Sequence, residues 1–257
     1  MIKIAVFIFI FGSFIGSFLN VCISRIPQGE SIAHPPSHCS FCGKDLKPLD
    51  LIPLISYIFL KGRCRYCSTE LSLEYPLMEI FTGVLFSLIY IAFGASFALI
   101  KYMVFASLAI VIGFIDFKHQ DVYSSTILIG GCSAIIFMIL EGVVSNGWKF
   151  NMAIVSNYLL GAFIGAICIA FIVYTTKGMG EGDIQIAALC GAFLGWKLAI
   201  LTLFLSFFIG GTAAGILLLR KKKKGKDSMA YGSFLCIGAF VALFIGNALI
   251  KYYLLFF

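Results

Sequence analysis

Six long stretches of this sequence contain no charged residue, and they constrain the fold more than any other feature. They comprise residues 4–24, 80–100, 122–140, 151–176, 198–219 and 228–250. Each has roughly the 20 apolar residues that an α-helix needs to cross a bilayer. Of the 257 residues, 61% are hydrophobic and only 12% are charged, which exceeds what the core of a soluble protein requires. The sequence therefore predicts an all-α polytopic membrane protein.

The number of helices follows from two further segments. Residues 75–116 are too long for one crossing, and Gly94 divides them into two predicted helices, whereas residues 184–196 form a shorter segment before Lys197. We expect about eight transmembrane helices, or seven if the short segment is re-entrant. The apolar run after Lys3 continues without a small-residue cleavage site, so we interpret it as a retained helix and not as a signal peptide.

Lysine and arginine predict the orientation. If the segment between the first two helices faces the cytoplasm, that side collects 14 of the 19 basic residues, and the other face keeps Lys3, Lys101, Lys149, Lys197 and Lys251. This distribution obeys the positive-inside rule and places both termini outside. We interpret the basic run at 220–226 as a topology anchor in preference to a site for anionic lipid or nucleic acid.

One cytoplasmic module is predicted between the first two helices. In residues 25–74, Cys39-x-x-Cys42 is followed after 21 residues by Cys64-x-x-Cys67, a spacing typical of zinc-ribbon ligand sets. Disulfides or a redox pair are the alternatives, but a cytoplasmic segment is kept reducing. We therefore predict a structural zinc site held by four thiolates.

The predicted domain organisation has three parts. Residues 1–24 form the first transmembrane helix, residues 25–74 the cytoplasmic zinc-binding domain, and residues 75–257 a transmembrane bundle. A module of about 50 residues has little core of its own, so the metal would supply much of its folding free energy. We interpret His34 and His38, which lie near the first cysteine pair, as solvated residues of this module.

Two aspartates stand at the edges of apolar segments. Asp116 ends an apolar run, and Asp183 closes a turn formed by Gly180, Glu181 and Gly182 before the next run. Ionisable residues at such positions are costly, so they are functional candidates by default. We expect the two carboxyls to meet in a water-filled cleft open to the cytoplasm and to form the catalytic dyad of an aspartic peptidase.

The chemistry of such a dyad follows from proximity. Like charges close together cannot both ionise, so the two carboxyls share one proton. The ionised carboxyl takes a proton from water and the protonated one donates to the peptide carbonyl. Gly180 and Gly182 support the catalytic turn because residues without a side chain allow the backbone and the substrate to approach.

Several motifs in sequence order resemble one known family, the bacterial type IV prepilin peptidases, which are also called prepilin leader peptidase and N-methyltransferase. They are Phe18-Leu19-Asn20-Val21, Arg25-Ile26-Pro27, both cysteine pairs, Glu74-Tyr75-Pro76-Leu77-Met78-Glu79, Ile115-Asp116, Gly178-Met179-Gly180-Glu181-Gly182-Asp183 and Tyr231-Gly232-Ser233-Phe234-Leu235. The chain departs from the family at Gln185, where members commonly carry lysine, at Tyr123-Ser124, where Pro-Asp is common, and at Ser233, where proline is common.

The resemblance implies a function and its partners. It implies a multi-pass enzyme of the bacterial cytoplasmic membrane that removes the short leader of type IV prepilins or pseudopilins on the cytoplasmic side. It also implies methylation of the new N-terminus from S-adenosylmethionine, with Gly62 and Glu79 as candidate residues for that activity. No nucleic-acid partner is expected, and the remaining partner is membrane lipid.

Two other classes of protein are alternatives. A presenilin-like intramembrane protease shares Gly-x-Gly-Asp, but its first aspartate usually follows tyrosine, whereas Ile115 precedes Asp116 here, and the cysteine module has no counterpart there. A non-enzymatic zinc-tethered scaffold or transporter would carry polar residues deep along several helices. The long uncharged stretches disfavour it.

Overall fold

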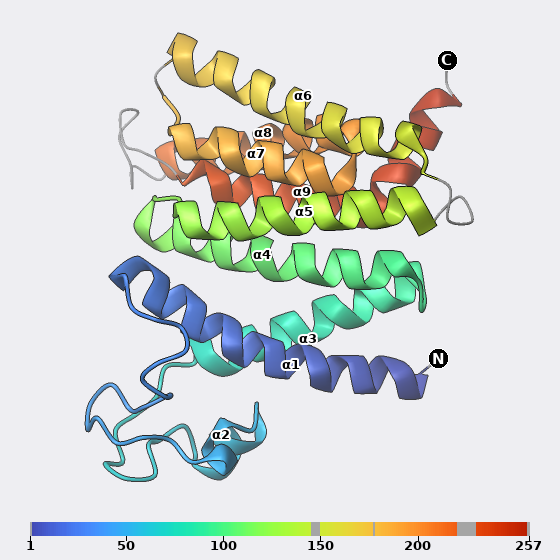
Figure 1. Ribbon diagram of the computed structural model, residues 1–257. Coiled ribbons are helices and arrows are strands. Elements are labelled where there is room, and N and C mark those ends of the chain that lie inside the picture. The colour runs from blue at the N-terminus through green and yellow to red at the C-terminus, as the bar shows by residue number, and fades with distance from the viewer. Residues whose placement is uncertain (1, 145–149, 177, 220–229, 256–257) are drawn as a thin grey trace. The chain divides into compact units, whose positions relative to one another are not determined.

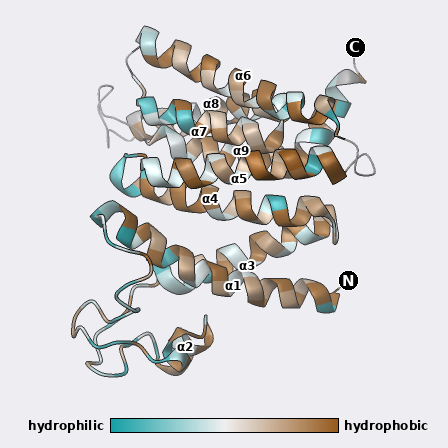
Figure 2. Cartoon of the chain, viewed as in Figure 1, coloured by the Kyte–Doolittle hydropathy of each residue, from teal (hydrophilic) through white to brown (hydrophobic). Residues whose placement is uncertain are grey.

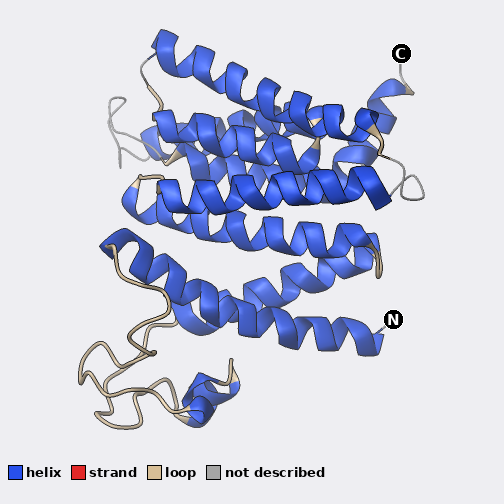
Figure 3. Ribbon diagram, viewed as in Figure 1, coloured by secondary structure: helices blue, strands red, loops and turns tan. Residues whose placement is uncertain are grey.

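The computed structural model describes residues 2–144, 150–176, 178–219 and 230–255. Within these ranges all regular secondary structure is helical. Two isolated β-bridges occur there, and no β-strand (Figure 3). The helices are α1 (Ile2–Arg25), α2 (Ile55–Phe59), α3 (Glu74–Phe93), α4 (Phe97–His119), α5 (Ser124–Val144), α6 (Met152–Thr176), α7 (Glu181–Leu194), α8 (Trp196–Leu219) and α9 (Tyr231–Leu254) (Figure 1). The predicted all-α class is confirmed.

Seven of the described helices are long and apolar enough to cross a membrane, namely α1, α3, α4, α5, α6, α8 and α9. Hydrophobic residues dominate their surfaces, as Figure 2 shows. The predicted break near Gly94 is confirmed, because α3 ends at Phe93 and Gly94 caps it with a φ of 64°. Helix α7 is not among these seven. It has 14 residues and a length of about 21 Å, which is shorter than the roughly 30 Å hydrocarbon layer. The basic run at 220–226 lies outside the described residues.

The chain forms two compact units, residues Met1–Ser107 and Leu108–Phe257. In the first unit, α1 packs against α3 through small residues. A Cβ atom on Gly12 would lie 2.9 Å from the Cα atom of Gly83, and one on Gly16 would lie 2.9 Å from the Cα atom of Glu79. Such close backbone approach favours van der Waals packing between the helices, because the hydrophobic effect cannot drive helices together inside lipid. The division at residues 24 and 74 stays a prediction.

The second unit is built around α7. This helix contacts α5, α6, α8 and α9, and most of its apolar side chains are buried, including Ile186 and Phe193. Its contact with α6 is the closest in this unit, because a Cβ atom on Gly161 or Gly191 would collide with the backbone of the opposite helix. Enclosure on all sides explains how so short a helix is accommodated, since it need not span the lipid by itself.

Residues 26–73 form a module of loops and short helices in the first unit. Arg25, at the end of α1, is buried and donates through its guanidinium to the carbonyl oxygens of Ser31 (3.0 Å), Pro35 (2.8 Å) and Pro36 (3.3 Å). These charge-assisted hydrogen bonds fold the start of the module back onto the helix. The first cysteine pair is therefore held at a fixed distance from the membrane segment.

Candidate active site and metal centre

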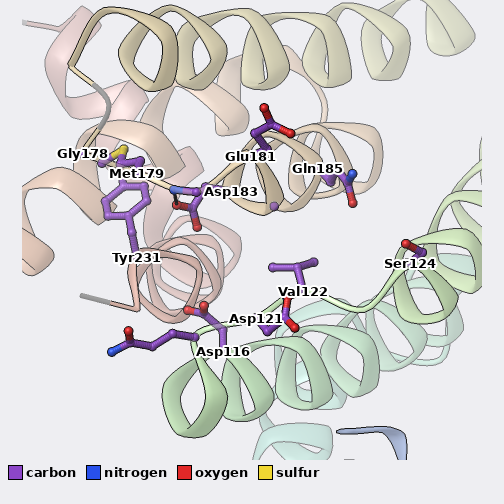
Figure 4. A pocket seen from close by; sticks show the side chains of 13 residues that line it. Asp116, Asp121, Val122, Ser124, Gly178, Met179, Glu181, Asp183, Gln185 and Tyr231 are labelled. Carbon is purple, nitrogen blue, oxygen red and sulfur yellow. Dashed lines mark hydrogen bonds between the residues drawn. The ribbon is translucent and has the colours of Figure 1, made fainter. Parts of the chain in front are cut away.

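A pocket of about 460 Å³ opens at one end of the second unit. Its lining comes from four places: the end of α4 with the loop that follows, the start of α5, the start of α7 with the turn before it, and the start of α9 (Figure 4). The lining residues are Asp116, Ser124, Gln185, Tyr231 and residues 120–122 and 178–183. Both predicted catalytic aspartates and both predicted supporting glycines are among them.

Asp116 lies in the last turn of α4 and is only 4% exposed. Its Oδ2 atom accepts the backbone N–H of Ser233 at 2.6 Å and lies 3.0 Å from the hydroxyl of the same residue. That hydroxyl is also 2.8 Å from the carbonyl oxygen of Gly113, so its single proton is donated to one acceptor at a time. The start of α9 thus fixes one carboxylate oxygen and leaves Oδ1 for other partners.

Asp183 lies in the first turn of α7 and is 6% exposed. Its Oδ2 atom accepts the backbone N–H of Gly180 at 3.2 Å, and its own N–H donates to the Gly180 carbonyl at 3.1 Å. This reciprocal pair caps the N-terminus of α7, where a carboxylate is also favoured by the helix dipole. The side chain is therefore oriented by the turn that precedes it.

The structure brings the two aspartates together. Figure 4 shows both side chains directed into the same pocket from different helices, and both residues line that pocket. Gly232 of α9 lies beside them, because a Cβ atom there would be 3.0 Å from Oδ2 of Asp116 and 2.5 Å from Ile186. Only a residue without a side chain fits between α9 and this carboxylate.

The two glycines of the turn contribute differently. Gly180 has an ordinary extended conformation, with φ −79° and ψ 151°, so it serves mainly through its N–H and carbonyl groups. Gly182 is needed for its small size, because a Cβ atom there would lie 2.5 Å from Val122. Close contact with Val122 brings the loop after α4 against the start of α7.

Two residues of this site were not predicted from the sequence. Ser233 was noted only as a departure from a family pattern, yet it contacts Asp116 directly. Tyr231 lines the pocket, and its hydroxyl lies 2.8 Å from that of Ser206 on α8, with its ring against Phe207. A motif at the start of α9 was the available signal, but it does not tell which helix α9 faces.

The four predicted metal ligands also come together. The sulfur atoms of Cys39, Cys42, Cys64 and Cys67 lie within 4.8 Å of one another, and all four are free thiols. Thiolates at the corners of a tetrahedron around zinc, each ~2.3 Å from the ion, would be about 3.8 Å apart. The sulfur atoms of Cys39 and Cys67 are 3.8 Å apart. The donor set and its spacing fit a structural zinc ion.

The two cysteine pairs are held by the same hydrogen-bond pattern. In the first pair, the N–H of Cys39 donates to the carbonyl of Lys44 at 3.0 Å, and the N–H of Gly43 donates to the carbonyl of Cys39 at 2.9 Å. In the second pair, the N–H of Cys64 donates to the carbonyl of Thr69, and the N–H of Ser68 donates to the carbonyl of Cys64, each at 2.9 Å. Gly43 and Ser68 have φ values of 68° and 60°. Each pair is therefore one tight turn that directs two sulfur atoms toward a common point.

Contacts of Thr69 and Asp50 influence the second cysteine pair. Hydrogen bonds with the hydroxyl and the backbone of Thr69 lower the pKa of the Cys67 thiol to about 6, which favours the thiolate that a metal requires. Asp50, whose side chain is almost fully buried, accepts Nε of Arg65 at 2.7 Å and the hydroxyl of Tyr66 at 3.4 Å. Asp50 thereby joins the second turn to the segment that follows the first.

Gly62 and Glu79, the candidates for methyl transfer, both lie in the first unit and have local contacts. The Glu79 carboxylate is buried and accepts the N–H of Leu54 at 2.8 Å. Gly62 has a φ of 68°, and a Cβ atom there would lie 2.9 Å from the Tyr57 hydroxyl. These contacts explain both residue types without a bound cofactor, so their assignment to methyl transfer stays a prediction.

Comparisons with known proteins agree with this arrangement. Residues 10–93 match the model of the bacterial peptidase A24 N-terminal domain, and residues 103–215 match that of the type IV leader peptidase family. No solved structure matches the chain significantly.

Similar proteins include three that are each named prepilin leader peptidase/N-methyltransferase. The protein of Bacillus subtilis (strain 168) is 32% identical, with 96% of each chain covered. That of Aeromonas hydrophila is 30% identical over 96% of this chain and 92% of its own length. That of Myxococcus xanthus (strain DK1622) is 35% identical, and the matched region covers 84% of this chain and 63% of the longer relative. The match extends over nearly the whole of two relatives, and the chain therefore belongs to the type IV leader peptidase family.

Proposed function

We propose that this protein is a membrane aspartic endopeptidase that removes the short leader peptide of type IV prepilins or pseudopilins and methylates the new N-terminus. The observation that carries the peptidase is the convergence of Asp116 and Asp183, two nearly buried carboxyls, in one pocket. Family membership favours this function over a presenilin-like protease and over a scaffold or transporter.

The contacts of the two carboxyls support a division of roles between them. Ser233 places its N–H at 2.6 Å and its hydroxyl at 3.0 Å from one oxygen of Asp116, whereas Asp183 accepts the Gly180 N–H at the longer distance of 3.2 Å and also receives the backbone N–H of Gly232. Hydrogen bonds donated to a carboxylate favour its ionised form. We assign Asp116 as the general base and Asp183 as the proton donor of the pair, which shares one proton.

Peptide hydrolysis then proceeds by ordinary acid–base steps. Asp116 takes a proton from a water molecule, whose oxygen attacks the carbonyl carbon of the scissile peptide bond. Asp183 donates its proton to the carbonyl oxygen as the tetrahedral intermediate forms. Collapse of the intermediate breaks the C–N bond: the protonated Asp116 gives its proton to the leaving nitrogen, and Asp183 takes back the proton of one hydroxyl, which restores the starting protonation of the pair.

The proposed setting is the bacterial cytoplasmic membrane. The positive-inside distribution favours a cytoplasmic location for the ends of α4, α6 and α8 and the starts of α5, α7 and α9. In the proposed orientation the pocket opens on that side. A leader that precedes an apolar pilin segment would reach this pocket from the cytoplasm while that segment stays in the bilayer.

The proposed cofactors are a structural zinc ion and S-adenosylmethionine. The four cysteines would hold zinc and leave no open position on it, so the metal would stabilise the module and take no part in hydrolysis. S-adenosylmethionine is proposed as the methyl donor from family membership, and Glu79 already accepts the N–H of Leu54.

The dyad predicts that Asp116→Asn and Asp183→Asn each lower leader cleavage by about 10²- to 10⁴-fold or more, because neither amide can exchange the shared proton. The measurement is cleavage of a prepilin-like peptide by purified, reconstituted protein, with mass analysis of both products. Asp121→Asn is the matched control, because Asp121 lines the same pocket but is exposed, and it should retain most activity. Near-normal cleavage by either dyad variant would remove that residue from catalysis.

The role of Ser233 predicts a smaller effect. Ser233→Ala removes the hydroxyl but keeps the backbone N–H, so we expect kcat to fall about 10-fold, the lower range for loss of one hydrogen bond to a charged group. Ser124→Ala, a hydroxyl lost from the same pocket lining, should change kcat less than twofold. Equal effects of the two substitutions on kcat would argue against a positioning role for Ser233.

Metal analysis of the purified protein is expected to find one zinc ion per chain. Cys64→Ser or Cys67→Ser should abolish retention of that ion, because three thiolates leave the tetrahedral set incomplete. Cys132→Ser and Cys168→Ser change exposed cysteines of α5 and α6 and should leave the zinc content unchanged. Absence of zinc, or stoichiometric disulfides among the four cysteines in reducing cells, would contradict the assignment.

The two activities are expected to be separable. Methyl transfer to an amine needs no pair of carboxyls, so Asp183→Asn should still methylate a pre-cleaved pilin peptide. Changes at Gly62, or Glu79→Gln, should weaken methylation more than cleavage, with Glu74→Gln on the first turn of the same helix as the control. Radiolabel transfer from S-adenosylmethionine measures this.

Two results would contradict that separation. Loss of methylation in Asp183→Asn together with cleavage would mean that one site serves both reactions. Absence of transfer by the unmutated protein would make this chain a peptidase only.

A further inference from the structure

We propose that α2 is an interfacial helix that lies in the surface of the same membrane that α1 and α3 cross, with its outer face against lipid. Three features of the first compact unit support this location: the depth at which α2 is held, the residues that α2 exposes, and the satisfaction of its backbone hydrogen bonds.

The depth of α2 is set by one hydrogen bond. Leu54 immediately precedes α2, and its N–H donates to Oε2 of Glu79 on α3 at 2.8 Å. Glu79 is five residues beyond Glu74, where α3 begins, which is about 7.5 Å along the helix axis. The start of α2 is therefore level with the second turn of a membrane-spanning helix. In Figure 1, α2 lies below α1, at a level between the two ends of that helix.

The tie to Glu79 is a specific one. Leu54 has a φ of 62° and a ψ of −47°, a combination that a leucine rarely adopts because it strains the backbone. The buried carboxylate of Glu79 accepts the N–H of this strained residue. A backbone distortion that is fixed by a buried charge indicates that the direction in which α2 leaves α3 is determined by the fold.

The outer face of α2 is apolar. Ile55, Ile58 and Phe59 are 52%, 72% and 81% exposed, and their i, i+3, i+4 spacing places them on one side of the helix. The other side is attached to the module, since the hydroxyl of Tyr57 donates to the carbonyl of Leu71 at 3.1 Å. An apolar face of this kind, next to a membrane-spanning helix, is typical of helices that lie in the interface.

Lipid is the occupant that the neighbouring surface indicates. On α3, the residues level with Glu79 include Leu77, Ile80 and Phe81, which are also exposed and belong to a helix that crosses the bilayer. The outer face of α2 therefore continues a lipid-facing surface. Lys61 lies two residues after the end of α2 and is exposed, and its long side chain can reach the headgroups.

The backbone of α2 meets the requirement that lipid imposes on polar groups. The N–H groups of Ile58, Leu60 and Gly62 donate to Leu54 (3.0 Å), Ser56 (2.9 Å) and Tyr57 (2.9 Å). Pro53, before the helix, has no N–H to satisfy, and that of Leu54 is taken by Glu79. A short helix whose donors are paired in this way can enter the interface without unsatisfied amides.

The consequence concerns the metal module. Cys64 follows Phe59 by five residues, so an anchored α2 holds the second cysteine pair at the membrane surface. Together with Arg25 at the other end of the module, this anchor would restrict the module to one orientation relative to the bilayer.

Tryptophan fluorescence in vesicles tests the proposal. The full-length protein with Trp148→Phe and Trp196→Phe, which removes both native tryptophans, receives Phe59→Trp and is reconstituted into phosphatidylcholine vesicles with or without bromine on the acyl chains. Leu77→Trp is the matched lipid reference, because Leu77 is 60% exposed on α3 close to Glu79. Phe41→Trp, 72% exposed between Cys39 and Cys42, is the water reference.

We expect brominated lipid to quench the Phe59→Trp fluorescence to within about twofold of the Leu77→Trp value, and aqueous acrylamide to quench Phe41→Trp at least threefold more than Phe59→Trp. Acrylamide quenching of Phe59→Trp equal to that of Phe41→Trp, without quenching by brominated lipid, would overturn the proposal. Protection from both quenchers would also overturn it and assign the face to a protein, either a second copy of the chain or an apolar segment of a substrate.

Discussion

The structure depends on close backbone contact between α7 and the helices around it. Inside a membrane the hydrophobic effect does not bring helices together, so packing and small residues must do so. Gly161 of α6 and Gly191 of α7 meet backbone to backbone, and Gly165 meets Ala187 one turn away. Because α7 is too short to span the bilayer alone, this enclosure is what allows Asp183 to start a helix at the edge of the membrane.

The second carboxyl depends on the same kind of contact at a different place. Gly232 lets α9 approach α4 until the N–H of Ser233 is 2.6 Å from Asp116. A Cβ atom at position 232 would lie 3.0 Å from Oδ2 of Asp116, so a larger residue there would have to displace that carboxyl. The dyad is therefore assembled by glycine contacts on two helix pairs, and its geometry is a property of the packing and not of the local sequence around either aspartate.

The sequence predicted those features that have a local physical cause. Uncharged stretches of helical length predicted the spans, Gly94 predicted the break between α3 and α4, and the spacing of Cys39, Cys42, Cys64 and Cys67 predicted a cluster that the structure assembles. Ser233, Tyr231 and the contact of Glu79 with Leu54 could not be predicted, because each depends on which face of one helix meets another. The five residues of α2 are too few to produce a periodic signal within a loop.

The position of the pocket at the ends of the spans reconciles two opposing requirements. Two carboxyls share a proton when they are close and poorly hydrated, which favours burial, and Asp116 and Asp183 are 4% and 6% exposed. The proposed hydrolysis nevertheless consumes water, and the bilayer centre has almost none. Gln120, Asp121, Glu181 and Gln185 line the same pocket and are exposed. A polar entrance that leads to buried carboxyls supplies water from one side only, whereas a dyad at mid-membrane depth would need a polar channel through the lipid-facing helices.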